Sequence, residues 1–438
     1  MTSRQQILFV AVLLIVVLNI TNLTRVRPSL FMESVALPDV TLLPKRRRRI
    51  ILFGPHDRFN FGDLLFEKIV SKLLVTHRNY ADSDLIRAGL FDVNMSNFGG
   101  HHSIASIHRV REASRRDGGY HIIYLGGECL RCSFECGVSM LPDVASQSAA
   151  RQHQVSDCAY LLPKKDLMPA NRIPPIVAVA NSVGGNFNFK ESPPDCRISV
   201  ETADFVTFRD MKLNTTHRYI PLAQSRPDSA ILTSLLFDRT IAQYGSIGQM
   251  QQLRNGTGYL AIQFKVADSY EENSGKIAQV LDRIYKMTNL TTVFFQAGSV
   301  PRHDSLALYE QVSRQMTTPN FIFTTTHLWA IVALIRYSSA VISTSLHVRI
   351  MAFVHARPRV TMCDPSYKHG FFISLWESED ATKCIDRLWN ANAVTRALKT
   401  SMATSPNKTY AALQRAIDSY MSGFEEWSSL FDKADQIQ

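Results

Sequence analysis

The sequence contains no internal repeat at a fixed period and no low-complexity tract, so it gives no sign of a repeat protein. It has 438 residues, of which 45% are apolar and 20% are charged. This composition is typical of a globular protein, and the length suffices for two domains of ordinary size. A sizeable hydrophobic core is therefore expected.

Positive charge is not spread evenly, because residues 45–49 (KRRRR) supply half of the formal net charge of +10. This run could be a nuclear signal or a polyanion-binding patch. Its position directly before a strand-like segment favours a solvated linker end. We therefore expect no nucleic-acid partner.

Residues 7–18, ILFVAVLLIVVL, form an apolar run behind a short head that carries Arg4. The run is shorter than the ~20 residues that span a bilayer, and no A-x-A-like cleavage site follows it. A cleaved signal peptide is the alternative, but we favour a signal anchor over residues 7–20. A cytosolic tail (1–6) would precede it, and the catalytic part would be lumenal, in the Golgi or endoplasmic reticulum.

Possible N-glycosylation triplets agree with a lumenal location. They begin at Asn19, Asn22, Asn94, Asn214, Asn255, Asn289 and Asn407. In an oxidising lumen some of the seven cysteines would form disulfides, and the odd count leaves at least one thiol unpaired. The spacing of Cys129, Cys132 and Cys136 can hold a metal, yet no second cluster accompanies it, so disulfide bonding is preferred.

A proline-containing stem is expected over residues 21–49, followed by alternating strand-like and helical segments. The buried strand-like runs are IILFG, HIIYLGG, PIVAVANS, DFVTFRD, RYIPL, GYLAIQFK, TTVFFQAG, FIFTT, AVISTS and RVTMCD. Helical stretches are expected at 303–316, 327–338 and 346–356. This alternation predicts two doubly wound α/β domains with parallel sheets. We place them at 50–240 and 255–400, with the boundary within 236–257 and a helical segment at 401–438.

Polar residues follow several of these strands at the edge where open α/β sheets bind ligands. Asn60, Gly62 and Asp63 follow the first strand, where Asp63 can cap a helix and Gly62 allows a ligand to approach the backbone. A purely structural cap and turn would need the same residues. Gly126 and Gly127 offer another backbone surface after HIIYL, although a tight turn explains them equally well.

Arg209 ends the run DFVTFRD, and its guanidinium can bind a carboxylate or phosphate through two hydrogen bonds. The alternative is a surface pair with Asp210 that would contribute little to stability.

The segment AVISTSLHVRIMAFVHARPRVTM predicts a strand, a turn, a helix, a loop and a strand. Ser345 can cap the helix, whose free N–H groups can hold a phosphate, and His347 and Arg349 add donors beside it. A cationic imidazole is unfavourable at a helix N-terminus, so His347 is either neutral and structural or meets a bound anion.

In combination these features resemble the polysaccharide pyruvyl transferase family over roughly residues 50–390. The matching pieces, in the order of the family, are N-x-G-D, the glycine pair, the Arg-Asp pair, P-D-S-A at 227–230, and SLHVRIMAF before ARPRV. The resemblance implies a GT-B-type protein with two Rossmann-like domains facing a cleft. It also implies transfer of pyruvate from phosphoenolpyruvate to a sugar, as a ketal.

Carried over by position, His347 corresponds to the catalytic histidine of the family and Arg209 to an arginine that engages the donor. Ser345 stands where the family often has Arg, so one cation is missing or is replaced by Arg349.

We expect a glycan acceptor, plausibly with a terminal galactose, and neither a metal nor another cofactor. Asp82-Ser83-Asp84 has the D-x-D pattern of metal-held nucleotide sugars but is expected in a surface turn. The alternatives are a GT-B glycosyltransferase that uses a nucleotide sugar, or an inactive membrane-tethered glycan-binding protein.

Overall fold

The computed structural model describes most of the chain from Arg47 onward. The described residues are 47–168, 176–185, 191–210, 220–221, 223–266, 268–301, 303–364, 367–379, 381 and 383–437. The predicted tail and signal anchor, and the stem up to residue 46, lie outside them. None of the helices in these ranges has the length and apolar character needed to cross a bilayer.

The first half of the described chain forms a parallel sheet with the strand order β3-β2-β1-β4-β5-β6-β7. Its strands are β1 (Ile50–Phe53), β2 (Leu85–Gly89), β3 (Ala105–Ser106), β4 (His121–Tyr124), β5 (Ala178–Val183), β6 (Phe205–Phe208) and β7 (Gln224–Ser225). Every residue of β1, β4, β5 and β6 is buried, as expected for a parallel sheet covered on both faces. The sheet order is that of a Rossmann fold.

The second half forms a parallel sheet with the order β10-β9-β8-β11-β12. Its strands are β8 (Tyr259–Gln263), β9 (Thr291–Phe295), β10 (Asn320–Phe323), β11 (Ala340–Ser343) and β12 (Arg359–Thr361). Each corresponds to a run of the sequence that predicts a strand. Both sheets belong to one compact unit, Arg47–Gln438.

Three strands of the first sheet, β2, β3 and β7, were not predicted from the sequence. In β2, Arg87 interrupts the apolar pattern; its buried guanidinium is neutralised by Glu67, with Nε 2.9 Å from Oε1. The predicted strand RYIPL lies mostly outside the described residues, which include only Ile220 and Pro221 of it.

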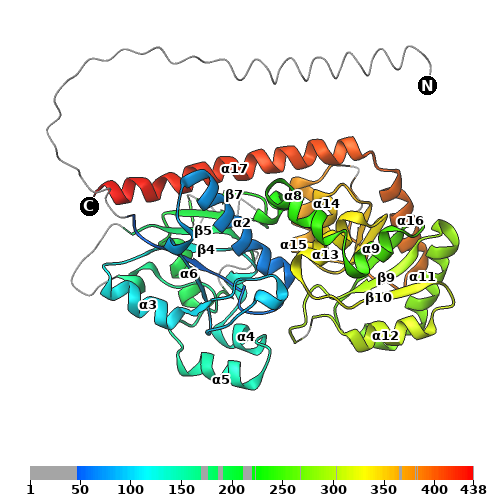
Figure 1. Ribbon diagram of the computed structural model, residues 1–438, viewed down its shortest axis with the longest axis horizontal. Helices are drawn as coiled ribbons and strands as arrows, with labels where there is room; N and C mark the ends of the chain where they lie inside the picture. Colours follow the sequence, from blue (N-terminus) through cyan, green and yellow to red (C-terminus); the bar gives the residue numbers. More distant parts are fainter. Residues whose placement is uncertain are drawn as a thin grey trace, which may run out of the picture. The chain divides into compact units, whose positions relative to one another are not determined.

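Helices connect the strands and cover the sheets (Figure 1). In the first half they are α2 (Phe61–Arg78), α3 (Ile107–Arg116), α4 (Phe134–Ser139), α5 (Val144–Gln152) and α6 (Pro194–Glu201). The predicted boundary region contains α8 (Thr233–Tyr244) and α9 (Gly248–Arg254). The second half adds α10 (Asp268–Glu272), α11 (Ser274–Thr288), α12 (Leu306–Gln315), α13 (Leu328–Tyr337), α14 (Leu346–Val354), α15 (Lys368–Trp376) and α16 (Ala391–Ala403).

The last helix, α17 (Pro406–Gln436), joins the two halves. Figure 1 shows it in red, running past the helices of the second half and back to the first sheet. Its Tyr420 hydroxyl donates to the Asn181 side chain at 3.2 Å, and Arg78 of α2 donates to Ser428 at 2.7 Å. Trp427 is almost completely buried in a hydrophobic cluster that contains residues of both halves. This helix therefore helps to hold the two sheets together.

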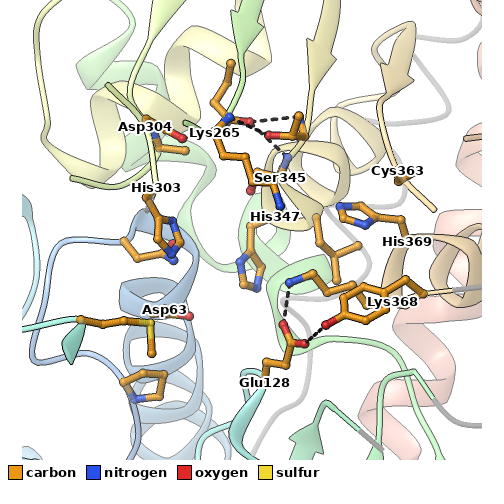
Figure 2. A pocket seen from close by; sticks show the side chains of 18 of the residues that line it. Asp63, Glu128, Lys265, His303, Asp304, Ser345, His347, Cys363, Lys368 and His369 are labelled. Atoms are coloured by element: carbon orange, nitrogen blue, oxygen red, sulfur yellow. Dashed lines mark hydrogen bonds and ion pairs between the residues drawn. The ribbon is translucent and has the colours of Figure 1, made fainter. Parts of the chain in front are cut away.

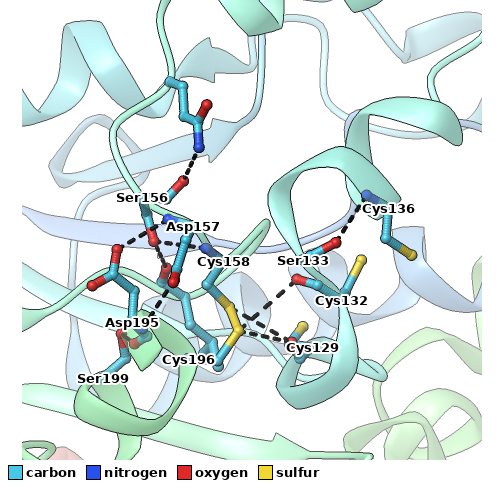
Figure 3. The surroundings of a disulfide bond; sticks show 12 residues. Cys129, Cys132, Ser133, Cys136, Ser156, Asp157, Cys158, Asp195, Cys196 and Ser199 are labelled. Atoms are coloured by element: carbon cyan, nitrogen blue, oxygen red, sulfur yellow. Dashed lines mark hydrogen bonds between the residues drawn. A yellow bond between two sulfur atoms is a disulfide. The ribbon is translucent and has the colours of Figure 1, made fainter. Parts of the chain in front are cut away.

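The cysteines form two disulfides, Cys158–Cys196 and Cys363–Cys384. Cys129, Cys132 and Cys136 take part in no disulfide, so the prediction of disulfide bonding is wrong for these three. Figure 3 shows them next to the Cys158–Cys196 bridge, to which no disulfide joins them. Three of the seven cysteines thus remain outside disulfides, in agreement with the expectation of at least one.

Candidate active site

The ends of several strands meet at a cavity of about 850 Å³ that is lined by both halves of the described chain. In a parallel sheet all carboxyl ends lie at one edge, which is where such sheets bind ligands. The lining residues from the first half include Arg58, Asn60, Asp63, Glu128 and Arg209. Those from the second half include Lys265, His303, Ser345, His347 and Lys368. Figure 2 labels seven of these side chains around one central space: Asp63, Glu128, Lys265, His303, Ser345, His347 and Lys368.

Three of the charged or polar side chains form a buried cluster at the base of the cavity. The Arg209 Nη1 atom lies 2.5 Å from Asp228 Oδ2 and 3.3 Å from His347 Nε2. The same His347 nitrogen lies 3.4 Å from Asp228 Oδ2. The structure therefore brings together the two predicted catalytic residues, although 138 positions separate them in the chain.

Asp228 completes this cluster and was not selected from the sequence. It is fully buried, and burial alone would raise its pKa, but Arg209 and His347 outweigh this effect and lower the pKa to about 2. Its Oδ1 also accepts a hydrogen bond from the Ala230 N–H at 2.9 Å, which caps a short 3-10 helix, Ser229–Leu232. The motif P-D-S-A contained this residue, yet a helix cap alone would have explained it.

Arg209 is not the exposed partner of Asp210 that the sequence left open. Both side chains are buried, and Asp210 accepts a hydrogen bond from the Gly185 N–H at 3.0 Å. The Nε of Arg209 is buried and has no hydrogen-bond partner among the described residues. A buried guanidinium with an unused donor at a cavity wall is suited to an anionic ligand.

The start of α2 forms another wall. Asn60 lines the cavity and caps the helix, because its Oδ1 accepts from the Gly62 N–H at 3.2 Å. Gly62 is needed for packing: a Cβ on it would lie 1.9 Å from Nδ1 of His347. Asp63 lines the cavity with its carboxylate 3.6 Å from Arg58. Of these three residues, two face the cavity and Gly62 lets the catalytic candidate approach the helix.

Gly126 and Gly127 do not line the cavity, so the expectation that they present backbone to a ligand is not supported. Both have positive φ angles, 108° and 87°, which non-glycine residues rarely adopt. They turn the chain after β4 and lead directly to Glu128, whose side chain does line the cavity. The tight-turn alternative is the better explanation.

The side chain of Gln263 supports the turn before α14 through hydrogen bonds. Its Oε1 accepts hydrogen bonds from the N–H groups of Thr344 and Ser345, at 3.2 and 3.1 Å. Ser345 lines the cavity and caps α14 by accepting from the Val348 N–H at 3.5 Å. Several N–H groups of this turn are therefore already used by the protein, which leaves fewer for a phosphate than the sequence suggested.

Arg349 is not a ligand-binding residue, and this prediction is wrong. Its side chain is completely buried away from the cavity and makes two hydrogen bonds to Glu377, of 2.6 and 3.0 Å. A further bond of 2.9 Å goes to the Thr361 hydroxyl, and Arg359 shares the same Glu377 carboxylate. Because α14 turns by about 100° per residue, a residue two positions after His347 points in a very different direction.

Four further cations line the cavity and were not predicted from the sequence: Arg58, Arg131, Lys265 and Lys368. Lys368, at the start of α15, lies 2.7 Å from Glu128, whose other oxygen accepts a 2.7 Å hydrogen bond from Tyr367. Although burial opposes it, Lys368 and Tyr367 lower the pKa of Glu128 to about 2. Arg58 donates to the Tyr160 hydroxyl at 2.9 Å, and Lys265 follows β8. Only their positions after strand ends could have indicated them.

No group of three or more histidine, cysteine or acidic side chains in the described ranges is arranged to hold a metal ion. The predicted turn at Asp82–Asp84 is a short 3-10 helix with Asp82 bound to Arg87, away from the cavity.

Comparison with known proteins identifies the family of the chain. A sequence model of the family described as polysaccharide pyruvyl transferase matches residues 60–364, which is more than half of the chain. The chain belongs to this family. It is therefore a transferase, and the match spans Asp63, Arg209, Asp228 and His347. The chain has no significant match among curated protein sequences.

Solved structures with the same fold are distant in sequence. The UDP-N-acetylglucosamine 2-epimerase of Rickettsia bellii has 11% identity and a TM-score of 0.53, over 89% of this chain and 99% of its own. A Listeria monocytogenes protein assigned as the same kind of epimerase has 10% identity and a TM-score of 0.51, over 87% and 97%. At this level the likeness shows the fold alone: two α/β halves of the GT-B type.

Proposed function

We propose that this pyruvyl transferase uses phosphoenolpyruvate as its donor and a terminal sugar of a glycan, with galactose as the favoured candidate, as its acceptor. The observation that supports the donor most is Arg209, which lines the cavity with its Nη1 atom 3.3 Å from Nε2 of His347. Phosphoenolpyruvate carries a carboxylate and a phosphate, and a guanidinium binds either through paired, charge-assisted hydrogen bonds.

The cavity offers further cations to this small polyanion. Arg58 and Lys368 flank the same space, each next to a carboxylate of the protein, Asp63 and Glu128 respectively. Lys265 has no acidic partner within 4 Å in the described chain. These residues can supply the positive charge that Ser345 does not provide and that Arg349 is too buried to provide.

His347 is placed for acid/base chemistry. In the proposed reaction it gives a proton to the methylene carbon, which becomes the methyl group, and C2 becomes an oxocarbenium-like centre. A sugar hydroxyl adds to C2, the bond from C2 to the phosphate oxygen breaks, and a second hydroxyl closes the ketal. Asp228 and Arg209 hold the imidazole of His347 in position for these transfers.

We also propose that the catalytic part works in the lumen of the Golgi or endoplasmic reticulum, anchored by residues 7–20. The apolar run and the glycosylation triplets support this. The two disulfides add to the support, because such bonds persist in oxidising compartments. A glycosidase-induced mobility shift of the cell-expressed full chain tests the assignment; an unglycosylated chain exposed to the cytosol would contradict it.

The donor and acceptor are tested by incubating a soluble form, residues 47–438, with phosphoenolpyruvate and a galactoside. We expect release of phosphate and an acid-labile ketal on the sugar. Consumption of a nucleotide sugar without ketal formation would instead favour the GT-B glycosyltransferase. Glycan binding without thermal stabilisation by phosphoenolpyruvate would favour the inactive glycan-binding protein.

A further inference from the structure

A second imidazole faces the cavity and has no role in the chemistry described so far. His303 lies in the loop between β9 and α12, and its side chain is half-buried in the cavity wall. Figure 2 shows His303 and His347 on facing sides of the same space. The ring nitrogens of His303 make no hydrogen bond to any residue in the described part of the chain, whereas His121 is bonded at both nitrogens.

The loop that carries His303 is firmly held. The His303 N–H donates to the Val300 carbonyl at 3.0 Å, and its own carbonyl accepts from Val266 at 2.7 Å. The neighbouring Asp304 carboxylate accepts from the Ala297 N–H at 2.5 Å and from Gln263 at 2.6 Å. Gln263 is the residue that also supports the turn before His347. The loops that carry the two imidazoles are therefore held by one framework, while the ring nitrogens of His303 stay available to a ligand.

The surroundings of His303 favour the neutral imidazole. Burial lowers its pKa most; Arg58, Lys368 and Lys265 lower it further, and Asp63 opposes them, so that the pKa falls to about 4. At neutral pH the ring therefore has a free lone pair that can accept a proton. His347 instead contacts both Asp228 and Arg209 through its Nε2. The two imidazoles therefore differ in their surroundings, because only His303 has ring nitrogens without a partner in the described chain.

We propose that His303 is the general base that takes the proton of the attacking sugar hydroxyl while His347 protonates the methylene carbon of the donor. The assignment rests on the proposed function. As the C–O bond to the sugar forms, the hydroxyl proton moves to His303 and the proton of His347 moves to carbon. When the bond from C2 to phosphate breaks, His303 returns its proton to the leaving phosphate oxygen. The second hydroxyl then adds and reprotonates His347, so both histidines are restored.

The test compares His303→Ala and His303→Asn with the wild type, with His102→Asn as the control because His102 is exposed and outside the cavity. We expect both His303 variants to lose about 10²–10⁴-fold in kcat, while phosphoenolpyruvate binding, measured by calorimetry, stays close to that of the wild type. Added imidazole should restore turnover to His303→Ala, in proportion to its unprotonated form, and should not restore His303→Asn.

Retained thermal stability and donor binding show that the variants fold. If the wild type forms the ketal and His303→Asn has a near-normal kcat, the assignment of His303 as the base is wrong, while the proposed function stands. A loss carried only by donor affinity, or a His303→Ala variant that imidazole does not rescue, would overturn it too. Failure of the wild type to form any ketal would instead refute the proposed function, and this assignment with it.

Discussion

Two buried clusters of arginine and carboxylate groups lie at opposite faces of α14. They differ in whether all of their polar atoms have hydrogen-bond partners. In the first, His347 meets Asp228 and Arg209, and Arg209 keeps a buried Nε without a partner in the described chain. In the second, Arg349 and Arg359 both bond to Glu377, whose two oxygens are both occupied. The first faces a cavity, and the second is closed within the core.

The comparison teaches that an arginine near a candidate histidine is not by itself a ligand-binding residue. A charge whose partners are complete contributes to stability, and breaking such a pair is costly because it leaves an uncompensated charge. A cluster with unused donors at a cavity can instead bind a ligand. Four changes would break or sharpen this distinction.

The largest expected effect is on the cavity-facing cluster. His347→Ala should reduce kcat by about 10²–10⁴-fold, because the proton donor to carbon is removed. Because His347 is buried against Asp228 and Arg209, thermal unfolding of the variant must be measured beside its turnover to show that it folds. Turnover is measured by phosphate release, with His102→Ala as the control; unchanged turnover would remove His347 from the active site.

A substitution in the second cluster, formed by Arg349, Arg359 and Glu377, should change the stability of the protein. Glu377→Gln leaves Arg349 and Arg359 without a buried counter-charge, and we expect it to lower the free energy of unfolding by about 3–5 kcal/mol. Glu135→Gln, which disrupts an exposed pair with Arg151, should cost about 0–1 kcal/mol. Denaturant titration measures both. A Glu377→Gln protein that is as stable as the wild type but inactive would place Arg349 in the function after all.

Gly62→Ala probes how tightly the two halves meet at His347. The added Cβ would lie 1.9 Å from the imidazole, so the ring must shift. A displacement of about 1 Å can cost about 10²-fold in turnover, and we expect a loss of that order in kcat. Gly256→Ala, whose Cβ would meet its nearest atom at an ordinary 3.5 Å, is the matched control. Equal turnover in the two variants would mean that His347 tolerates displacement.

The smallest effect concerns the pH dependence of stability. The folded-state pKa of Asp228, about 2, lies below the usual value for an aspartate of about 3.9. Its ionised form therefore stabilises the folded protein above about pH 4, and this contribution is lost as the pH falls through about 2. The stability difference between wild type and Asp228→Asn should shrink over that range. Urea titrations at several pH values measure it; a constant difference would contradict the lowered pKa.

Much of the site could be predicted because strand ends are visible in the sequence. Arg209 and His347 each follow an all-buried strand, and the carboxyl ends of parallel strands share one edge. Arg58, His303 and Lys368 were not predicted because no local pattern tells a charged side chain that turns into a cavity from one that turns to solvent. Asp228 was overlooked because an aspartate that caps a helix looks the same in sequence whether or not a histidine lies beside it.

The sequence by itself determined most of the buried strands of the two sheets, the capped start of α14 and the membership of the family. Local propensity and hydrophobic pattern are enough for these, since they depend on neighbours along the chain. Only the tertiary structure decided that Arg209 would contact His347 across 138 positions and that Arg349 would turn to Glu377. Whether a buried charge binds a ligand or a counter-charge depends on which distant side chains fold against it.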